Sequence, residues 1–276
     1  MSTPQHPNQS IAFVGGGNMA SAIIGGLIQQ GMPAQQVMVI EPFDVARQQL
    51  EAKFGIRTQA SADDALQEAS LVIWAIKPQV FKEAALATSA FCHQALHLSV
   101  AAGIRSDSIA SWLGTQRVVR AMPNTPALVG LGQTGLFARP AVTAADQSWV
   151  EQVVATTGQF LWVQEESLLD AVTAISGSGP AYVFFFIEAM VEAGVRMGLS
   201  EAQAHQLAVG TFVGASELAR SANESPMILR ERVTSKGGTT YAAITAMQDA
   251  KLSPLFQAAL DTARARAHEL GDAFGS

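Results

Sequence analysis

A glycine-rich turn near the start of the chain constrains the fold more than any other feature. Three glycines follow the apolar run at residues 11–14 directly, and a helical pattern opens immediately behind them. The segment Gly15–Ala20 reads GGGNMA and fits the pattern G-x-G-x-x-G/A. A strand, a glycine turn and a helix in this order are typical of the first unit of a dinucleotide-binding fold. A generic glycine turn has the same composition, but this position in an alternating β–α frame favours the nucleotide interpretation.

Each position of this turn has a physical task in that interpretation. Gly15 permits a tight turn, and Gly17 lets the backbone approach a pyrophosphate. Ala20 keeps the helix close to the strand, while Asn18 and Met19 open the helix with amides that have no partner within it. The turn therefore predicts contacts between a dinucleotide and Gly15, Gly17, Asn18, Met19 and Ala20.

An acidic residue follows the second apolar run. Glu41 stands 24 positions after Gly17, where a carboxylate would bond the adenosine ribose hydroxyls and repel a 2′-phosphate. This placement favours NAD over NADP on local grounds. Glu41 also precedes Pro42 and could instead be a favourable charge at the start of the next helix. Both interpretations stay open, and so does the choice of coenzyme.

The first half of the chain alternates β-branched runs with helical patterns, as expected of βαβ units around a mainly parallel sheet. The expected strands are residues 11–14, 37–40, 71–76, 96–101, 117–122, 134–139 and 160–163. We therefore predict an α/β fold in which residues 1–164 form a doubly wound, Rossmann-type dinucleotide-binding domain.

Beyond Glu165 the strand pattern disappears, and residues 165–276 are expected to form an all-helical domain for substrate binding and dimerisation. Its helical stretch at 181–197 is apolar on nearly every face, so it must be buried all round. A small helical domain has limited means of surrounding it alone. We therefore expect a homodimer, and a larger assembly of dimers is compatible with the same argument.

Composition narrows the function. Lys and Arg number 17 against 23 Asp and Glu, a net charge of −6, without a basic run that could clamp nucleic acid. The single cysteine, Cys92, cannot form an internal disulfide, and no cluster has metal-ligand spacing. The first ten residues do not resemble a signal peptide, and the uninterrupted apolar runs are short. We expect a cytoplasmic protein without a metal, a membrane or a nucleic acid partner.

Two polar, glycine-containing segments stand out in the helical half. Residues 176–180 read SGSGP and residues 235–240 read SKGGTT, and both are poor in helix formers. Glycines ahead of a helix leave amides pointing outward, which suits a substrate carboxylate. Each segment could equally be a plain connection with capping hydroxyls.

Five segments in order carry a family resemblance: Gly15–Ala20, Ala75–Pro78, Ala121–Pro126, Asp170–Tyr182 and Val233–Thr240. Together they resemble pyrroline-5-carboxylate reductase over essentially the whole chain. The resemblance implies reduction of a cyclic imine with NADPH or NADH in the last step of proline synthesis. Many members of that family carry proline where this chain has Lys236.

The resemblance also implies site residues. Further coenzyme contacts would fall on Ala75, Ile76, Lys77, Pro78, Ala101, Ala102, Gly103 and Asn124. Substrate contacts would fall on Glu166, Ser178, Gly179, Pro180, Glu231, Gly237, Gly238, Thr239 and Thr240. Thr240 is the candidate for a polar catalytic contact, in a site expected between the two halves. Lys77 could equally be a solvated strand end.

Two other functions fit parts of the sequence. A hydroxyacid dehydrogenase needs a His or Lys proton donor, yet no lysine lies between Lys82 and Lys236, and the only histidines after His97 are His205 and His268. An imine nitrogen can be protonated before hydride arrives, so imine reduction needs no such donor. A non-enzymatic dinucleotide-binding protein would leave the two glycine segments without a role.

Overall fold

The computed structural model describes residues 10–275, which form two compact units. One unit contains the chain up to Ser178 together with Ala263 onward, and the other is Gly179–Thr262. The sequence places its domain boundary after residue 164, whereas here the segment 165–178 and the end of the last helix pack with the sheet. The boundary after residue 164 between two independently folding domains stays a prediction.

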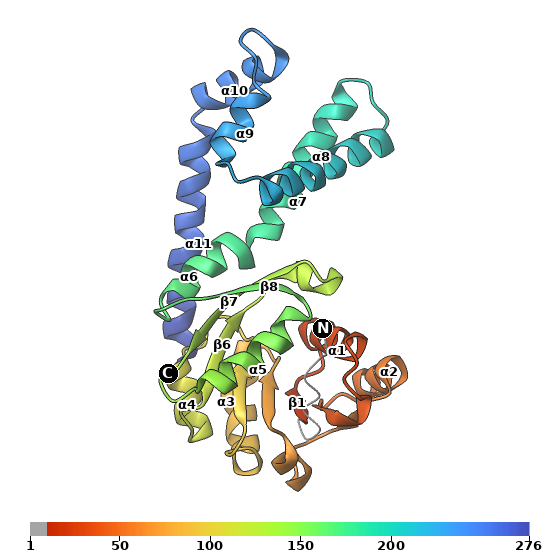
Figure 1. Cartoon of the computed structure of the whole chain (residues 1–276), viewed down its shortest axis with the longest axis vertical. Helices are drawn as coiled ribbons and strands as arrows, with labels where there is room; N and C mark the ends of the chain where they lie inside the picture. Colours follow the sequence, from red (N-terminus) through yellow and green to blue (C-terminus); the bar gives the residue numbers. More distant parts are fainter. Residues whose placement is uncertain (1–9, 276) are drawn as a thin grey trace. The chain divides into compact units, whose positions relative to one another are not determined.

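The first unit is built on one eight-stranded sheet (Figure 1). Its strands are β1 Ile11–Val14, β2 Val37–Ile40, β3 Arg57–Gln59, β4 Leu71–Trp74, β5 Leu96–Ser99, β6 Val118–Met122, β7 Gly132–Ala138 and β8 Gly158–Trp162. Their order in the sheet is β3-β2-β1-β4-β5-β6-β7-β8. All neighbours are parallel except β6 and β7, which are antiparallel. The predicted mainly parallel, doubly wound sheet is confirmed.

Two apolar cores lie on the two faces of this sheet. Alternate residues of a strand point to opposite faces, so Ile11 and Phe13 join one core while Ala12 and Val14 join the other. All four are buried, as are all residues of β2, β4 and β5. Burial on both faces explains why these strands read as continuous apolar runs.

The strand predictions were close, and their errors have simple causes. The runs starting at Leu71 and Leu96 end two residues earlier than expected, because their last residues belong to the loops at the carboxyl edge. The strand Arg57–Gln59 was missed because a short polar strand at the edge of a sheet carries no apolar signal.

Helices and short helical turns cover the sheet: α1 Asn18–Gln29, η1 Ala34–Gln36, α2 Asp44–Phe54, η2 Asp64–Glu68, α3 Pro78–Thr88, η3 Ser89–Phe91, α4 Ser106–Leu113, η4 Thr125–Val129 and α5 Ala144–Ala155. The sequence expects capped helix starts near Ser61 and at Thr143. Thr143 forms a capping box with Asp146, as expected. The helix near Ser61 is a short 3₁₀ turn that Asp63 caps instead.

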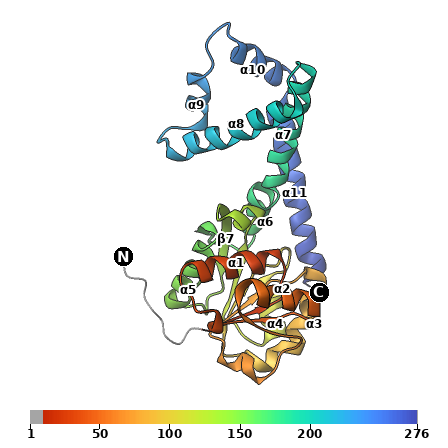
Figure 2. The ribbon, with the colours of Figure 1, turned by 90° about the vertical axis from the view of Figure 1, so that its right-hand side faces the viewer.

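The unit of residues 179–262 is helical within its described range, as expected: α7 Gly179–Arg196, α8 Glu201–Ser221, α9 Pro226–Arg232, α10 Thr239–Asp249 and the first half of α11, Leu252–Phe274. The sequence also predicts a capping box at Ser200 and Gln203, and this capping box starts α8. Helices α7 and α8 lie side by side as a hairpin (Figures 1 and 2).

Helix α7 leaves much of its apolar surface exposed in the single chain. Phe184 is 59% exposed and Phe185 66%, and Val183, Met190 and Val195 are exposed too. Among residues 10–275, the continuous helical run Leu168–Arg196 is the one that is long and apolar enough to cross a membrane by length and composition. The sequence expectation missed this run because polar residues divide it. A helix that pairs with another subunit passes the same test.

Candidate functional site

The strand order reverses between β1 and β4, which is where sheets of this type bind ligands at the carboxyl ends of their strands. Gly15 leaves β1 at this point with a φ of +96°. A Cβ on Gly15 would lie 2.6 Å from the carbonyl oxygen of Ala75 and 2.5 Å from Ile76 Cγ2. Only glycine fits this turn, because both the positive φ and the close approach exclude a side chain.

The start of α1 is open toward this edge. Gly17 is the N-cap, and no side chain caps the helix. A Cβ on Gly17 would meet no atom within 4 Å. Asn18 and Gly17 are exposed, whereas Ala20 is fully buried against the core. The amides that open α1 therefore face free space, which is the geometry that a pyrophosphate requires.

Glu41 lies directly beside this turn and is only 8% exposed. Its Oε2 accepts a hydrogen bond from the Gly16 amide at 2.9 Å, and its Oε1 accepts one from the Phe43 amide at 3.1 Å. Helix α2 starts later, at Asp44. The carboxylate thus ties the glycine turn to the end of β2, and this contact was not expected from either interpretation of the sequence.

The segment Ala75–Pro78 follows β4 on the other side of the glycine turn. The Ala75 amide donates to the Val14 carbonyl at 2.8 Å, Lys77 is the exposed N-cap of α3, and Pro78 is its first residue. Proline is favourable there because a first-turn amide has no partner within the helix. The structure brings this segment to the same edge as Gly15, and its coenzyme contacts stay predictions.

The segment 101–103 follows β5. Gly103 has a φ of +72°, and a Cβ on it would lie 3.3 Å from Leu270 Cβ and 3.4 Å from Phe274 Cδ2 of α11. Its close approach therefore serves helix packing. Ala101 is buried, whereas Ala102 is exposed at the turn. That this segment also lines a coenzyme is a prediction.

Asn124 follows β6 and is 8% exposed. Its Oδ1 accepts from the Gln133 amide at 2.9 Å, and its Nδ2 donates to the carbonyl of Ser176 at 3.2 Å and to its Oγ at 3.1 Å. Asn124 thus links the carboxyl edge of the sheet to the SGSGP segment.

Five residues poor in helix formers predict that the segment 176–180 interrupts the helix, and this prediction is wrong. Helix α6 (Leu168–Val172) continues through a π-helical turn, η5 (Thr173–Gly177), into α7. The Ser178 amide donates to the Thr173 carbonyl at 2.8 Å, so it is not free for an anion. Pro180 has no N–H for the carbonyl of Ser176 four residues before it. Asn124 donates to that carbonyl, which explains how the helix tolerates proline.

Glu166 lies in a polar cluster at the start of α4. Its carboxylate accepts from the Ser106 amide at 2.6 Å, from the Ser106 hydroxyl at 2.5 Å and from Arg120 Nη1 at 2.7 Å. Arg139 contacts Ser106 and pairs with Asp107 at the rim. These hydrogen bonds to Ser106 and Arg120 hold the Glu166 carboxylate in the unit that contains the sheet (the sheet unit). Its contact with the substrate stays a prediction.

In the helical unit, residues 235–238 form a turn before α10. The Gly238 amide donates to the Ser235 carbonyl at 3.0 Å, and Gly237 has a φ of +76°. These features define a type II turn. Gly238 is the N-cap of α10 and no side chain caps the helix, so the amides of Thr239 and Thr240 open it. Thr240 is half-buried at the second position and is not the cap.

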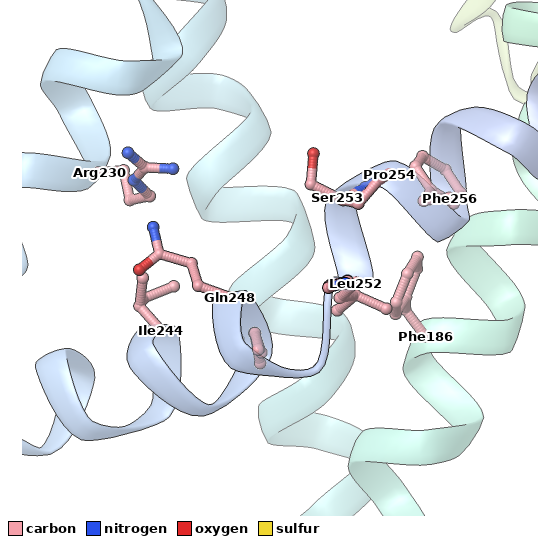
Figure 3. Close-up of a pocket in the computed structure, with 10 residues that line it drawn as sticks. Phe186, Arg230, Ile244, Gln248, Leu252, Ser253, Pro254 and Phe256 are labelled. Atoms are coloured by element: carbon pink, nitrogen blue, oxygen red, sulfur yellow. The ribbon is translucent and has the colours of Figure 1, made fainter.

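The face of α10 that carries Thr240 continues into a hollow of about 460 Å³ (Figure 3). Ile244, Met247 and Gln248 follow Thr240 at helical spacing and line it. Apolar side chains of α7 and α11 form the opposite wall, and Arg230 lies beside Gln248 on the α10 side of the hollow. Glu231, next to Arg230 on α9, is exposed.

Two residues of this region were not predicted. Ser176 partners Asn124, and Arg120 holds Glu166. Arg120 was detectable in principle, because a lone arginine inside the apolar strand β6 needs a buried partner. Ser176 gave no signal that distinguished it from a capping serine.

Family models match both halves of the chain. Residues 166–270 match a model described as pyrroline-5-carboxylate reductase dimerisation. Residues 10–103 match a model described as NADP oxidoreductase coenzyme F420-dependent.

Similar proteins extend this match to full length. A pyrroline-5-carboxylate reductase from Pseudomonas aeruginosa is 42% identical over 277 residues, covering 100% of both chains. The solved structure of a pyrroline-5-carboxylate reductase from Coxiella burnetii is 36% identical, with a TM-score of 0.89 over 95% of this chain and 98% of that one. A Plasmodium falciparum pyrroline carboxylate reductase with NADP bound shares the fold, at 24% identity, a TM-score of 0.84 and coverage of 96% and 98%. The chain therefore belongs to the pyrroline-5-carboxylate reductase family.

Proposed function

We propose that this chain reduces the cyclic imine 1-pyrroline-5-carboxylate to L-proline with NADPH or NADH. The observation that carries the proposal is the 42% identity to a reductase of this name over the full length of both chains. The open glycine turn lies where the strand order reverses between β1 and β4, and this position independently supports the binding of a nicotinamide coenzyme.

The coenzyme, when bound, supplies hydride. Its pyrophosphate is proposed to lie over Gly17 and the amides that open α1, where the chain leaves free space. The ribose of the adenosine is proposed to contact Glu41. The segments 75–78 and 101–103 and the Asn124 side chain are proposed to line the remainder of the coenzyme.

The substrate carboxylate is proposed to bind at the start of α10. The amides of Thr239 and Thr240 have no partner within the helix, and the type II turn at Gly237 and Gly238 brings backbone close to them without side chains. The Thr240 hydroxyl is proposed to hydrogen-bond the ring nitrogen. The substrate is also proposed to contact Glu166, Glu231 and residues 178–180.

Imine chemistry matches the residue types available. A protonated imine already carries the positive charge that hydride neutralises, so the protein needs to orient the ring and has little new charge to stabilise. A hydroxyl suffices for this task, whereas a carbonyl substrate needs a stronger acid. Thr240 satisfies the weaker requirement.

The test is direct. Purified protein is mixed with 1-pyrroline-5-carboxylate and NADPH, then with NADH, and the loss of reduced-nicotinamide absorbance is followed. We expect turnover with at least one coenzyme and proline as the product. Absence of turnover with both would reject the proposal, and turnover with a 2-oxoacid instead would favour a hydroxyacid dehydrogenase.

We also propose that the active protein is a homodimer in the cytoplasm. The exposed phenylalanines of α7 are an apolar surface that monomeric proteins seldom leave in water. The match to a dimerisation model over residues 166–270 supports a partner chain, and not lipid, as their cover. Light scattering distinguishes a dimer from a larger assembly, and cell fractionation tests the compartment.

A further inference from the structure

An arginine at the adenosine side of the proposed coenzyme site, Arg47, hydrogen-bonds to acceptors of its own chain. Arg47 Nη1 donates to the carbonyls of Glu41 and Pro42, each at 2.9 Å, and Arg47 Nη2 pairs with Asp44 Oδ1 at 2.9 Å. Only 19% of the Arg47 side chain is exposed, against 68% for Asp44. Arg47 is thus committed to three acceptors that all lie at the end of β2 and the start of α2.

The carboxylate of Glu41 is fixed in the same corner. Its two bonds to the backbone amides of Gly16 and Phe43 use one oxygen each, and they hold the group beside the glycine turn. In a sheet of this type the adenosine ribose lies at the end of the second strand. A ribose hydroxyl can still donate to this carboxylate, because each oxygen has a further lone pair.

The charged side chains near Glu41 determine whether a phosphate on the 2′ position of the ribose can bind there. A 2′-phosphate is best bound by an arginine that is free to form paired hydrogen bonds, and Arg47 is already paired with Asp44 and bonded to two carbonyls. The exposed cation Lys77 belongs to the end of β4, which is two strands away from β2. Adjacent strands are about 4.8 Å apart, so Lys77 starts about 10 Å from this corner.

We propose that this corner selects a coenzyme with a free 2′-hydroxyl, NADH over NADPH, and that Asp44 determines the specificity by holding Arg47 away from a 2′-phosphate. Glu41 contributes the hydrogen-bond acceptor for the hydroxyl and the charge that repels a phosphate. The inference rests on the proposed function, because it places the adenosine of a nicotinamide coenzyme at Glu41.

Binding measured without substrate tests this inference apart from catalysis. Dissociation constants are measured by calorimetry for NAD⁺ and NADP⁺, and for 5′-AMP and 2′,5′-ADP as probes of the adenosine end alone. The wild type is expected to bind NAD⁺ more tightly than NADP⁺ by about tenfold or more, and 5′-AMP more tightly than 2′,5′-ADP. Asp44→Asn, which keeps the shape but removes the charge, should reduce both preferences by about five- to tenfold, since a tenfold change needs only about 1.4 kcal/mol.

Two further variants identify the cause. Gln48→Ala removes the other partner of Asp44, whose Oδ2 accepts from Gln48 Nε2 at 2.8 Å, and leaves the contact to Arg47 in place. Its nucleotide preference should equal that of the wild type. Adding Arg47→Met to Asp44→Asn should abolish the gain in NADP⁺ binding.

Three results would overturn the inference: a wild type that prefers NADP⁺, an Asp44→Asn protein with unchanged preference, or a gain that persists without Arg47. Circular dichroism checks that each variant is folded. If folded wild type binds neither nucleotide, the proposed function itself fails. Binding of both with equal affinity rejects only the selectivity.

Discussion

Gly17 offers a clean test at the scale of a single residue. Its φ of −73° suits any amino acid, and an added Cβ would contact no atom of the chain within 4 Å. Gly17→Val should therefore fold normally but block the backbone approach of a pyrophosphate, weakening coenzyme binding by about tenfold or more. Titration calorimetry with NAD⁺ and NADP⁺ measures this effect. Unchanged affinity in a folded variant would remove Gly17 from the site.

Thr240 is the second residue-scale prediction. Because the hydroxyl is proposed to orient an already activated imine, Thr240→Ala should lower kcat/KM by about 10- to 100-fold and leave measurable turnover. Thr211→Ala is the matched control, since Thr211 is an exposed threonine on α8 outside the proposed site and its hydroxyl donates to the Leu207 carbonyl of its own helix. A Thr240→Ala protein with normal kinetics would show that the hydroxyl has no part in the reaction.

His97 predicts how stability depends on pH. It is fully buried in β5, its Nδ1 accepts from Trp74 Nε1 at 3.1 Å, and burial lowers its pKa from 6.5 to about 4. Between these pH values the unfolded chain binds a proton that the folded chain does not. Stability from this group is therefore complete above pH 6.5 and is lost as the pH falls to about 4, by on the order of 3 kcal/mol.

Urea unfolding at pH 7 and pH 5 measures this loss. His97→Gln should show a smaller decrease in the free energy of unfolding between the two pH values than the wild type, because glutamine does not titrate. His205→Gln, at an exposed position on α8, should decrease as the wild type does. Equal decreases in all three proteins would contradict the assignment to His97.

At the scale of elements, the turn before α10 carries a testable departure from the family pattern. Lys236 occupies the second position of a type II turn, where proline is favourable, and its amide makes no backbone hydrogen bond among residues 10–275. Lys236→Pro should raise the free energy of unfolding by about 0.4–1 kcal/mol, because proline restricts the unfolded chain. Thermal unfolding against Lys236→Ala measures this difference, and a lower Tm for the proline variant would contradict the turn type.

Helices and strands could be predicted from the sequence where residues close together in the chain determine the structure. The strands β1 and β2 and the capping boxes at Thr143 and Ser200 follow from apolar runs and short-range hydrogen bonds, and they appear as predicted. The π turn η5 was not predictable, because the partner that lets the helix continue past Pro180 is Asn124, which stands more than fifty positions earlier.

In the candidate site, too, local features could be predicted from the sequence and long-range contacts could not. The glycine turn was visible because Gly15 must adopt a positive φ, which is a local demand. The bonds of Glu41 to Gly16 and of Glu166 to Arg120 depend on which strands become neighbours in the sheet. Spacing along the sequence indicates that an acidic side chain is available, but not which donor it meets.

At the scale of the whole molecule, α7 predicts association. Phe185→Glu places a charge on its exposed apolar surface, so the proposed dimer should dissociate to a monomer in light scattering at micromolar concentration. Leu86→Glu is the control, since Leu86 is an exposed leucine on α3 of the sheet unit. A wild type that is a stable monomer would reject the dimer.

The division of α11 between the two units has a consequence for synthesis on the ribosome. Residues from Ala263 onward complete the sheet unit, where Arg105 pairs with Asp272 at 2.5 Å, Ser108 donates to the Gly275 carbonyl at 2.9 Å, and Phe274 packs against the core. The nascent sheet unit must therefore wait, with that side of its core uncovered, until the whole helical unit has been translated. Ribosome-bound chains stalled before Ala263 should accordingly engage chaperones more than chains released at full length.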